Sequence, residues 1–173
     1  MRHFKNCIAP IILSTCLCSS LFAQSDSLLV HQIRNYVKYI DSINSLNYVQ
    51  DKGFVKSIAE GVIKRDNKVV GGYGIYSLSN LKNDTVFRIE YHDNFGINTY
   101  KTYYYQNNKI VYATLEFKNT DEQETTFFRK EEFYNDDKVI LKSPEQNPKR
   151  YIDISSFSML DDGKKLLADF QKK

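Results

Sequence analysis

The chain has 173 residues and a formal net charge of +3, and 14% of its residues are aromatic although tryptophan is absent. Its three cysteines, Cys7, Cys16 and Cys18, all lie near the N-terminus, which excludes a disulfide scaffold, a thiol nucleophile and a thiolate metal site from the rest of the chain. The basic residues form no cluster of the kind that marks a nucleic-acid surface, so we expect no nucleic-acid partner.

The first 23 residues have the features of a secretory signal peptide. Arg2 and Lys5 give a positive start, residues 7–17 are largely apolar, and Ala23 offers a small residue at the cut. The apolar run is shorter than the roughly 20 residues that a membrane span needs. We therefore predict cleavage and no membrane span in the mature chain, with an uncleaved anchor as the alternative.

Cys16 and Cys18 follow Thr15 and Leu17, which are not the small residues that precede a lipid-modified cysteine. We therefore do not expect a lipid anchor. The mature chain is predicted to be a single domain over residues 24–173, secreted or periplasmic. Without its signal the chain carries 22 basic and 21 acidic residues, so its net charge falls close to zero.

Residues 25–46 are predicted to form a helix that begins at a cap on Ser25 or Ser27. Apolar residues recur at spacings of three and four and should lie on a sheet or, alternatively, on a partner helix: Leu29, Ile33, Tyr36, Ile40 and Ile43. His31 falls off this stripe, so we expect it to face solvent without a metal.

Residues 54–65 and 68–79 read as two strands joined by a turn at Asp66 and Asn67. The second strand contains three glycines, which predict a bend or bulge or, alternatively, a close approach of a helix or ligand: Gly71, Gly72 and Gly74. No helix follows these glycines, so they are not a dinucleotide fingerprint.

Residues 85–92 alternate clearly and place Arg88, Glu90 and His92 on one face of a strand. A carboxylate beside an imidazole can hold it in one tautomer, which makes Glu90 and His92 candidates for acid–base catalysis. The alternative is a solvated charged face.

Residues 101–118 are predicted to form a β-hairpin that turns at Asn107 and Asn108, because asparagine tolerates a left-handed backbone. Here the turn residues are followed by a lysine and two β-branched residues. The same motif, with Asn or Asp at both turn positions, recurs at Asp66 and at Asp136. We interpret the recurrence as repeated turn chemistry in one meandering sheet.

This turn would place Tyr103, Tyr105 and Tyr112 on one face of the hairpin, together with Lys101 and Glu116. Tyrosine combines a rigid apolar body with a polar tip and is favoured at recognition surfaces. These five residues are therefore the predicted binding residues. The alternative is that a helix covers this face and makes the tyrosines part of the core.

The remaining sequence predicts strands at 126–134 and 138–142 and a last helix capped by Ser155 or Ser156. Three residues of that helix should share an apolar face: Leu160, Leu167 and Phe170. The predicted fold is α+β, an antiparallel meander of six or seven strands with both helices packed on one face.

The sequence contains no zincin, P-loop, nucleophile-elbow or EF-hand motif. We predict a non-enzymatic exported module, without cofactor or metal, that binds a protein, peptide or glycan. One alternative is a small hydrolase or small-ligand enzyme that uses Glu90 and His92. Another is an envelope assembly subunit with an exposed edge strand at 138–142. The sequence does not set the oligomeric state.

Overall fold

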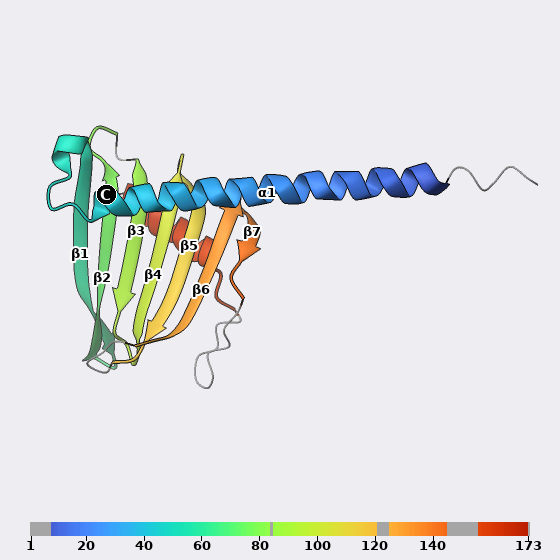
Figure 1. The fold of residues 1–173 in the computed structure, drawn as a ribbon. Helices are drawn as coiled ribbons and strands as arrows, with labels where there is room; N and C mark the ends of the chain where they lie inside the picture. The colour runs from blue at the N-terminus through green and yellow to red at the C-terminus, as the bar shows by residue number, and fades with distance from the viewer. Residues whose placement is uncertain (1–7, 84, 121–124, 145–155, 173) are drawn as a thin grey trace, which may run out of the picture.

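The computed structural model describes residues 8–83, 85–120, 125–144 and 156–172, with side chains from Asp26 onward. Seven antiparallel strands form one open sheet in chain order, with one helix before it and one after it (Figure 1). The elements are α1 (Ile8–Asn44), the 3₁₀ turn η1 (Gln50–Lys52), β1 (Phe54–Arg65), β2 (Lys68–Asn80), β3 (Val86–Asp93), β4 (Asn98–Gln106), β5 (Lys109–Lys118), β6 (Thr126–Asn135), β7 (Lys138–Lys142) and α2 (Met159–Gln171).

The three predicted two-residue turns are confirmed. Both central residues of each turn have positive φ angles: Asp66 and Asn67 at 50° and 62°, Asn107 and Asn108 at 53° and 59°, and Asp136 and Asp137 at 46° and 64°. Such turns match the right-handed twist of the flanking strands, and Asn and Asp adopt positive φ at little cost. The repeated motif therefore sets the ends of β1–β2, β4–β5 and β6–β7.

Each of these hairpins also contains a bulge, which the sequence predicted only in the glycine-containing strand β2. The pairing shifts by one residue after the second β-branched residue of each motif, which leaves one unpaired residue per hairpin: Val70, Val111 and Ile140. A bulge inserts one residue into one strand and so moves every later side chain to the other face. The motif thus encodes a bulge as well as a turn.

The bulge at Val111 makes the predicted grouping of the tyrosines wrong. Tyr103 pairs with Ala113 rather than with Tyr112, and Tyr104 pairs with Tyr112. Tyr103 and Tyr105 therefore share one face of the sheet, and Tyr112 lies on the other.

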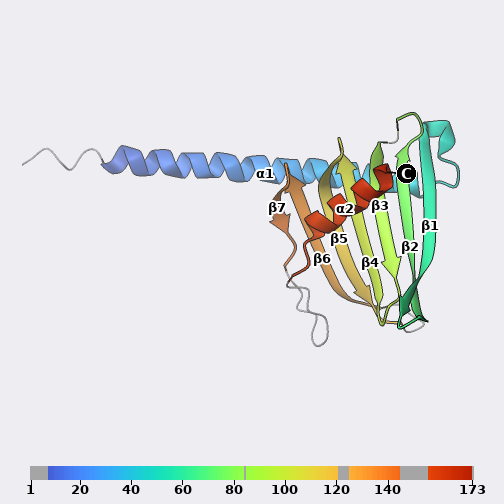
Figure 2. The same cartoon turned by 180° about the vertical axis from the view of Figure 1, so that it is seen from behind.

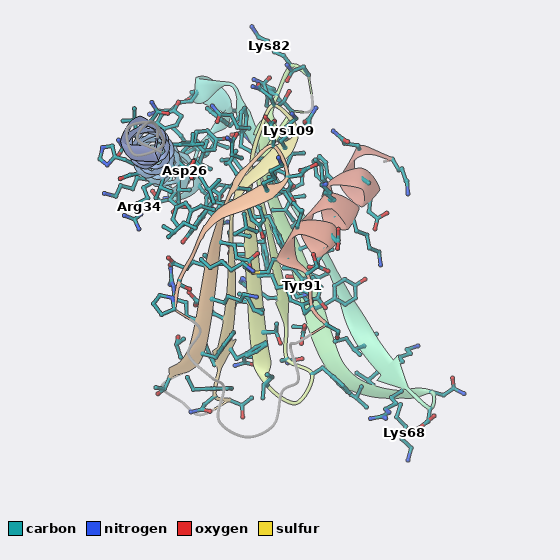
Figure 3. The ribbon with its side chains drawn as sticks, turned by 90° about the vertical axis from the view of Figure 1, so that its right-hand side faces the viewer. Asp26, Arg34, Lys68, Lys82, Tyr91 and Lys109 are labelled. Carbon is teal, nitrogen blue, oxygen red and sulfur yellow. The ribbon has the colours of Figure 1, made fainter. Side chains whose placement is uncertain are left out.

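The α+β class and the seven-stranded meander are as predicted, but the helices lie on opposite faces of the sheet rather than on one (Figure 3). We call these the α1 face and the α2 face. Consecutive buried residues such as Tyr103 and Tyr104 make both faces of the central strands apolar, so both need a cover. The two cores are separate clusters, one between the sheet and each helix.

Helix α1 crosses one end of the sheet and extends past β7 (Figure 1). Its predicted stripe is confirmed, because Ile33, Ile40 and Ile43 are buried against strand residues such as Leu78 and Phe133. The helix does not begin at Ser25 or Ser27 but continues back to Ile8. No glycine or proline interrupts the chain over residues 11–44, so nothing local stops the helix there.

Helix α2 lies on the face of the sheet opposite to α1 and crosses the strands obliquely, in front of them in the view of Figure 2. Its N-cap is Ser158, whose hydroxyl accepts a hydrogen bond from the N–H of Asp161 at 3.2 Å. The predicted caps are therefore wrong: Ser156 precedes the helix, and Ser155 lies outside the described residues. Among the residues that the structure describes, no helix is long and apolar enough to cross a membrane.

Candidate binding surface

The two predicted binding residues Tyr103 and Tyr105 are core residues under α2, each with 0% of its surface exposed. The Tyr103 hydroxyl donates to Asp162 Oδ2 at 2.6 Å, and the Tyr105 hydroxyl donates to the backbone oxygen of Gly163 at 2.8 Å. Burial, reinforced by the nearby Asp162 carboxylate, raises the pKa of both phenols far above the usual value. Both side chains attach α2 to the sheet and are closed to a ligand.

Lys101 lies on the same face and also links the sheet to α2. Its ammonium is 3.2 Å from Asp162 Oδ2 and lies over the rings of Tyr91 and Phe157, at 4.9 and 4.8 Å from their centroids. Such a cation held between two rings and a carboxylate is fixed in place. Burial and the neighbouring Asp93 carboxylate raise the pKa of Tyr91, which Figure 3 places beside α2, to about 12.

Tyr112 and Glu116 lie on the α1 face. Tyr112 is buried under α1 between the rings of Tyr104 and Phe133, whose centroids are 5.5 and 4.7 Å away. Glu116 is half-buried and pairs with Arg129 at 2.5 Å. The five predicted binding residues are thus divided between two faces, and all three tyrosines among them are buried.

The predicted row of Arg88, Glu90 and His92 is confirmed on the α1 face. Glu90 uses both carboxylate oxygens, one in contact with the Arg88 guanidinium and the other with Nε2 of His92. Arg88 also lies 3.5 Å from Asp41 of α1 and 5.7 Å from the ring centroid of Tyr104. The row therefore runs from the edge of α1 toward the opposite end of the sheet.

Glu90 has a lowered pKa. Burial alone would raise it, but the contacts with His92 and Arg88 outweigh burial and hold the pKa of the carboxyl below its usual value. Glu90 is therefore charged at neutral pH and acts as the anion that fixes a guanidinium and an imidazole on either side.

Two tyrosines flank His92 at the end of the row. The ring centroid of Tyr76 is 5.2 Å from that of His92, and the centroid of Tyr100 is 4.4 Å away in an edge-on arrangement. Lys118 places its ammonium 4.2 Å from the Tyr100 centroid. We call Tyr76, His92 and Tyr100 the aromatic cluster; it is the part of the α1 face that α1 leaves uncovered.

Gly74 makes room for this cluster. It pairs with His92 across the sheet, and a Cβ at this position would lie 2.9 Å from the Tyr76 ring. Any larger residue would displace Tyr76 from His92. The predicted bulge is confirmed at Val70, directly before Gly71, whereas the close neighbour of Gly74 is a side chain of the same strand and not the helix or ligand of the predicted alternative.

A shallow hollow of about 420 Å³ opens at the aromatic cluster. Asn94 forms part of its wall and accepts a hydrogen bond from the N–H of Gly72 at 2.6 Å. The hollow is lined by Glu60, Gly61, Gly72, Tyr73, Gly74, Tyr76, His92, Asp93, Asn94, Asn98 and Tyr100. Its volume is at the lower end of the range for small-ligand sites, about 300–1,000 Å³.

The sequence pattern indicated His92 and Glu90 but gave no signal for Tyr76 and Tyr100. These tyrosines come from β2 and β4, and only the pairing of Gly74, His92 and Tyr100 across three strands brings them together. The glycines of β2 also weaken the alternating pattern that would have assigned Tyr76 to a face.

His31 is exposed, as predicted, and its Nε2 is 3.2 Å from the Asn35 side chain. Within the described ranges no group of three or more His, Cys, Asp or Glu residues is arranged to hold a metal ion. Comparisons with protein-family models, with curated proteins and with solved structures find no match to this chain.

Proposed function

We propose that this chain is an exported, non-enzymatic module that binds a polypeptide partner through the aromatic cluster and the polar row beside it. The observation that carries the proposal is the part of the α1 face that α1 does not cover, where three rings border a hollow and Glu90 beside it contacts both Arg88 and His92. Export follows from the signal peptide predicted at residues 1–23.

The composition of this surface supports a protein or peptide ligand. Tyrosine and arginine are enriched at protein interfaces, where a rigid aromatic body is combined with a polar tip. A hollow of about 420 Å³ suits one or two side chains of a partner. The carboxylates of Glu60 and Glu90 and the guanidinium of Arg88 favour a polar segment over an apolar one.

The side chains of this surface are held in place before any ligand arrives. Glu90 fixes Arg88 and His92, and the Tyr76 hydroxyl donates to Glu60 at 3.3 Å. Ordering a long side chain on binding costs about 0.5–1.5 kcal/mol, and this cost is reduced when internal contacts already fix the rotamer. Preorganisation therefore supports recognition by this face.

The proposal is tested with the purified protein as bait in an extract of the envelope and culture medium of the source cells. We expect Tyr76→Ala combined with His92→Ala to weaken capture of a specific protein at least about tenfold, since interface hot spots cost more than 1 kcal/mol each. The matched control is Tyr48→Ala, which removes a tyrosine with 80% of its surface exposed outside the cluster.

Capture that persists in the double variant, with the fold intact by circular dichroism, would remove this surface from consideration. Capture lost equally in Tyr48→Ala would indicate non-specific adsorption. A partner that survives both controls is then titrated against the purified protein.

An acid–base enzyme is the second candidate, and the contact between Glu90 and His92 is the observation that favours it. The contact can hold the imidazole in one tautomer, as general base catalysis requires. The lowered pKa of Glu90 favours an orienting role over that of a proton donor. Turnover of ester or glycoside substrates that His92→Gln abolishes would support this alternative.

A further inference from the structure

The outer edge of β1 is the longer of the two edges of the sheet. β1 has 12 residues, whereas β7 at the other edge has five. Within the described ranges β1 pairs with β2 on one side and with no strand on the other. Ile58 and Val62 on this strand have 66% and 57% of their surface exposed. A long edge strand with exposed apolar side chains is a template for pairing with another strand.

The hydrogen bonds around β1 show which backbone groups point outward. The backbone oxygen of Gly53 accepts a hydrogen bond from the N–H of Leu81, the residue that follows β2. The N–H of Phe54 instead donates to the backbone oxygen of Val49, which lies outside the sheet. Because bonding alternates along an antiparallel strand, odd-numbered residues of β1 face β2 and even-numbered residues face outward. The outward-facing backbone groups of β1 beyond Phe54 therefore belong to Lys56, Ile58, Glu60, Val62 and Lys64.

From this pattern we infer that β1 pairs antiparallel with β1 of a second copy of the chain, about a two-fold axis at Ile58. Ile58 then lies opposite Ile58 of the partner subunit, and Lys56 lies opposite Glu60 of the partner subunit. The symmetry repeats the Lys–Glu pair on the other side of the axis. These three positions exchange about six backbone hydrogen bonds, two for each directly bonded pair.

The side chains of β1 fit this register on both faces. On the α1 face, opposite charges and an apolar pair lie across the interface, and such cross-strand pairs stabilise a sheet. On the α2 face, Ser57 lies opposite Ala59 of the partner subunit. Both residues are small, and both line a hollow of about 510 Å³ that Phe170 also borders.

Other registers of the same strand are less favourable. Centring the axis on Glu60 places two glutamates opposite each other, and like charges in this position are destabilising. Centring it on Val62 pairs Glu60 with Lys64 of the partner subunit but moves Ile58 opposite Asp66, which lies in the turn. The Glu60 axis would pair more of β1 but also brings Lys56 opposite Lys64 of the partner subunit, so the Ile58 register is the one that combines opposite charges with an apolar pair.

The inferred dimer stands independently of the proposed ligand site. A two-fold axis through an antiparallel strand pair is perpendicular to the sheet, so the α1 faces of both copies lie on the same side. Glu60 and Gly61 line the hollow at the aromatic cluster, which places the two hollows on either side of the axis. A symmetric partner would then meet two equivalent sites.

Charge reversal with the full-length protein tests the register. Sedimentation equilibrium up to about 100 µM should reveal a dimer whose Kd is of micromolar order. Glu60→Lys and Lys56→Glu should each raise the Kd about tenfold, because two attractive pairs become repulsive. The double variant Lys56→Glu/Glu60→Lys restores both pairs and should return the Kd to that of the wild type.

Lys64→Glu is the matched control and should leave the Kd unchanged. A wild-type protein that remains monomeric over the whole range would overturn the inference. So would dimerisation that is insensitive to both single reversals while each variant keeps the wild-type circular dichroism spectrum. Weakening by Lys64→Glu in place of Lys56→Glu would overturn the Ile58 register.

A cysteine at the axis gives a second test that does not depend on affinity. Two residues that exchange both backbone hydrogen bonds across an antiparallel pair have Cα atoms about 5.5 Å apart, within the range that a disulfide spans. In a background in which Cys7, Cys16 and Cys18 are replaced by serine, Ile58→Cys should therefore form a reducible dimer on mild oxidation. Val62→Cys should not, because the two copies of this residue would be eight residues apart along the strands, about 27 Å. Cross-linking of Val62→Cys with none at Ile58→Cys would refute the register.

Discussion

The two faces of the sheet are covered in different ways. On the α2 face the helix approaches the strands closely at Gly163, and the hydroxyls of Tyr103 and Tyr105 donate hydrogen bonds to it. On the α1 face a longer helix covers one end of the strands, and the rest is left to ion pairs and the aromatic cluster (Figure 1). Tyrosines are thus structural under both helices, and Tyr76 and Tyr100 remain accessible where α1 ends its cover of the α1 face.

The difference shows that the accessibility of a tyrosine here depends on its distance from a helix rather than on its strand. Tyr104 and Tyr100 lie on the same strand and the same face, four residues apart. Tyr104 lies under α1 and donates to Asp41 at 2.6 Å, whereas Tyr100 lies past the helix beside His92. Substitutions in the core and in a buried ion pair should therefore change the free energy of unfolding by different amounts.

The largest effect is expected from Phe128→Ala on the α2 face. Phe128 has 0% of its surface exposed and belongs to the core under α2, whereas its neighbour Phe127 has 39% exposed. Truncation of a buried phenylalanine costs about 3–5 kcal/mol of the free energy of unfolding, and Phe127→Ala should cost much less. Urea denaturation of both variants measures the difference, and equal losses would contradict the described burial.

Gly163→Ala should have an intermediate effect. A Cβ at this position would lie 2.6 Å from Tyr103 Cδ1 and 2.7 Å from Ile110 Cδ1. Overpacking costs about 1–3 kcal/mol, whereas alanine gains about 1 kcal/mol over glycine in a helix. We expect a net loss of up to about 2 kcal/mol by thermal or urea unfolding.

Ile110→Val removes one of the two atoms that the new methyl group meets, so it provides the control for Gly163→Ala. The double variant should be more stable than the sum of the two single losses predicts, by about 0.5 kcal/mol or more. Strict additivity, or a stabilising effect of Gly163→Ala alone, would show that α2 does not approach the sheet as described.

The smallest effect concerns the dependence of stability on pH. Burial alone would raise the pKa of Glu132, but hydrogen bonds from Tyr134 and Lys130 outweigh it and hold the pKa below its usual value. A carboxyl whose pKa is lower in the folded state stabilises the protein above its unfolded pKa of about 4.3. That stability is lost as the pH falls through the lower, folded pKa.

Glu132→Gln should therefore lower the free energy of unfolding by about 1 kcal/mol at pH 7 and bring it close to that of the wild type near pH 3. Asp169→Asn, which changes an exposed carboxylate on α2, is the control and should change little at either pH. A Glu132→Gln variant that loses stability equally at both pH values would indicate a packing defect in place of the lost charge.

Much of the fold could be predicted because its determinants are local. The paired Asn and Asp residues determine where three hairpins turn, since few other residues adopt positive φ at low cost. The predicted bounds of β1 and β7 match the observed ones, and the row of Arg88, Glu90 and His92 follows from the two-residue period of a strand.

By itself, the sequence determined the turns, the strands, the α+β class and the candidates Glu90 and His92. Only the tertiary structure decided the bulge at Val111 that splits Tyr112 from Tyr103, the placement of the helices on opposite faces and the meeting of Tyr76, His92 and Tyr100. The physical reason is that a turn depends on the φ preferences of two adjacent residues. Which face a side chain occupies, and what covers it, depends on pairing and packing between residues far apart in the chain.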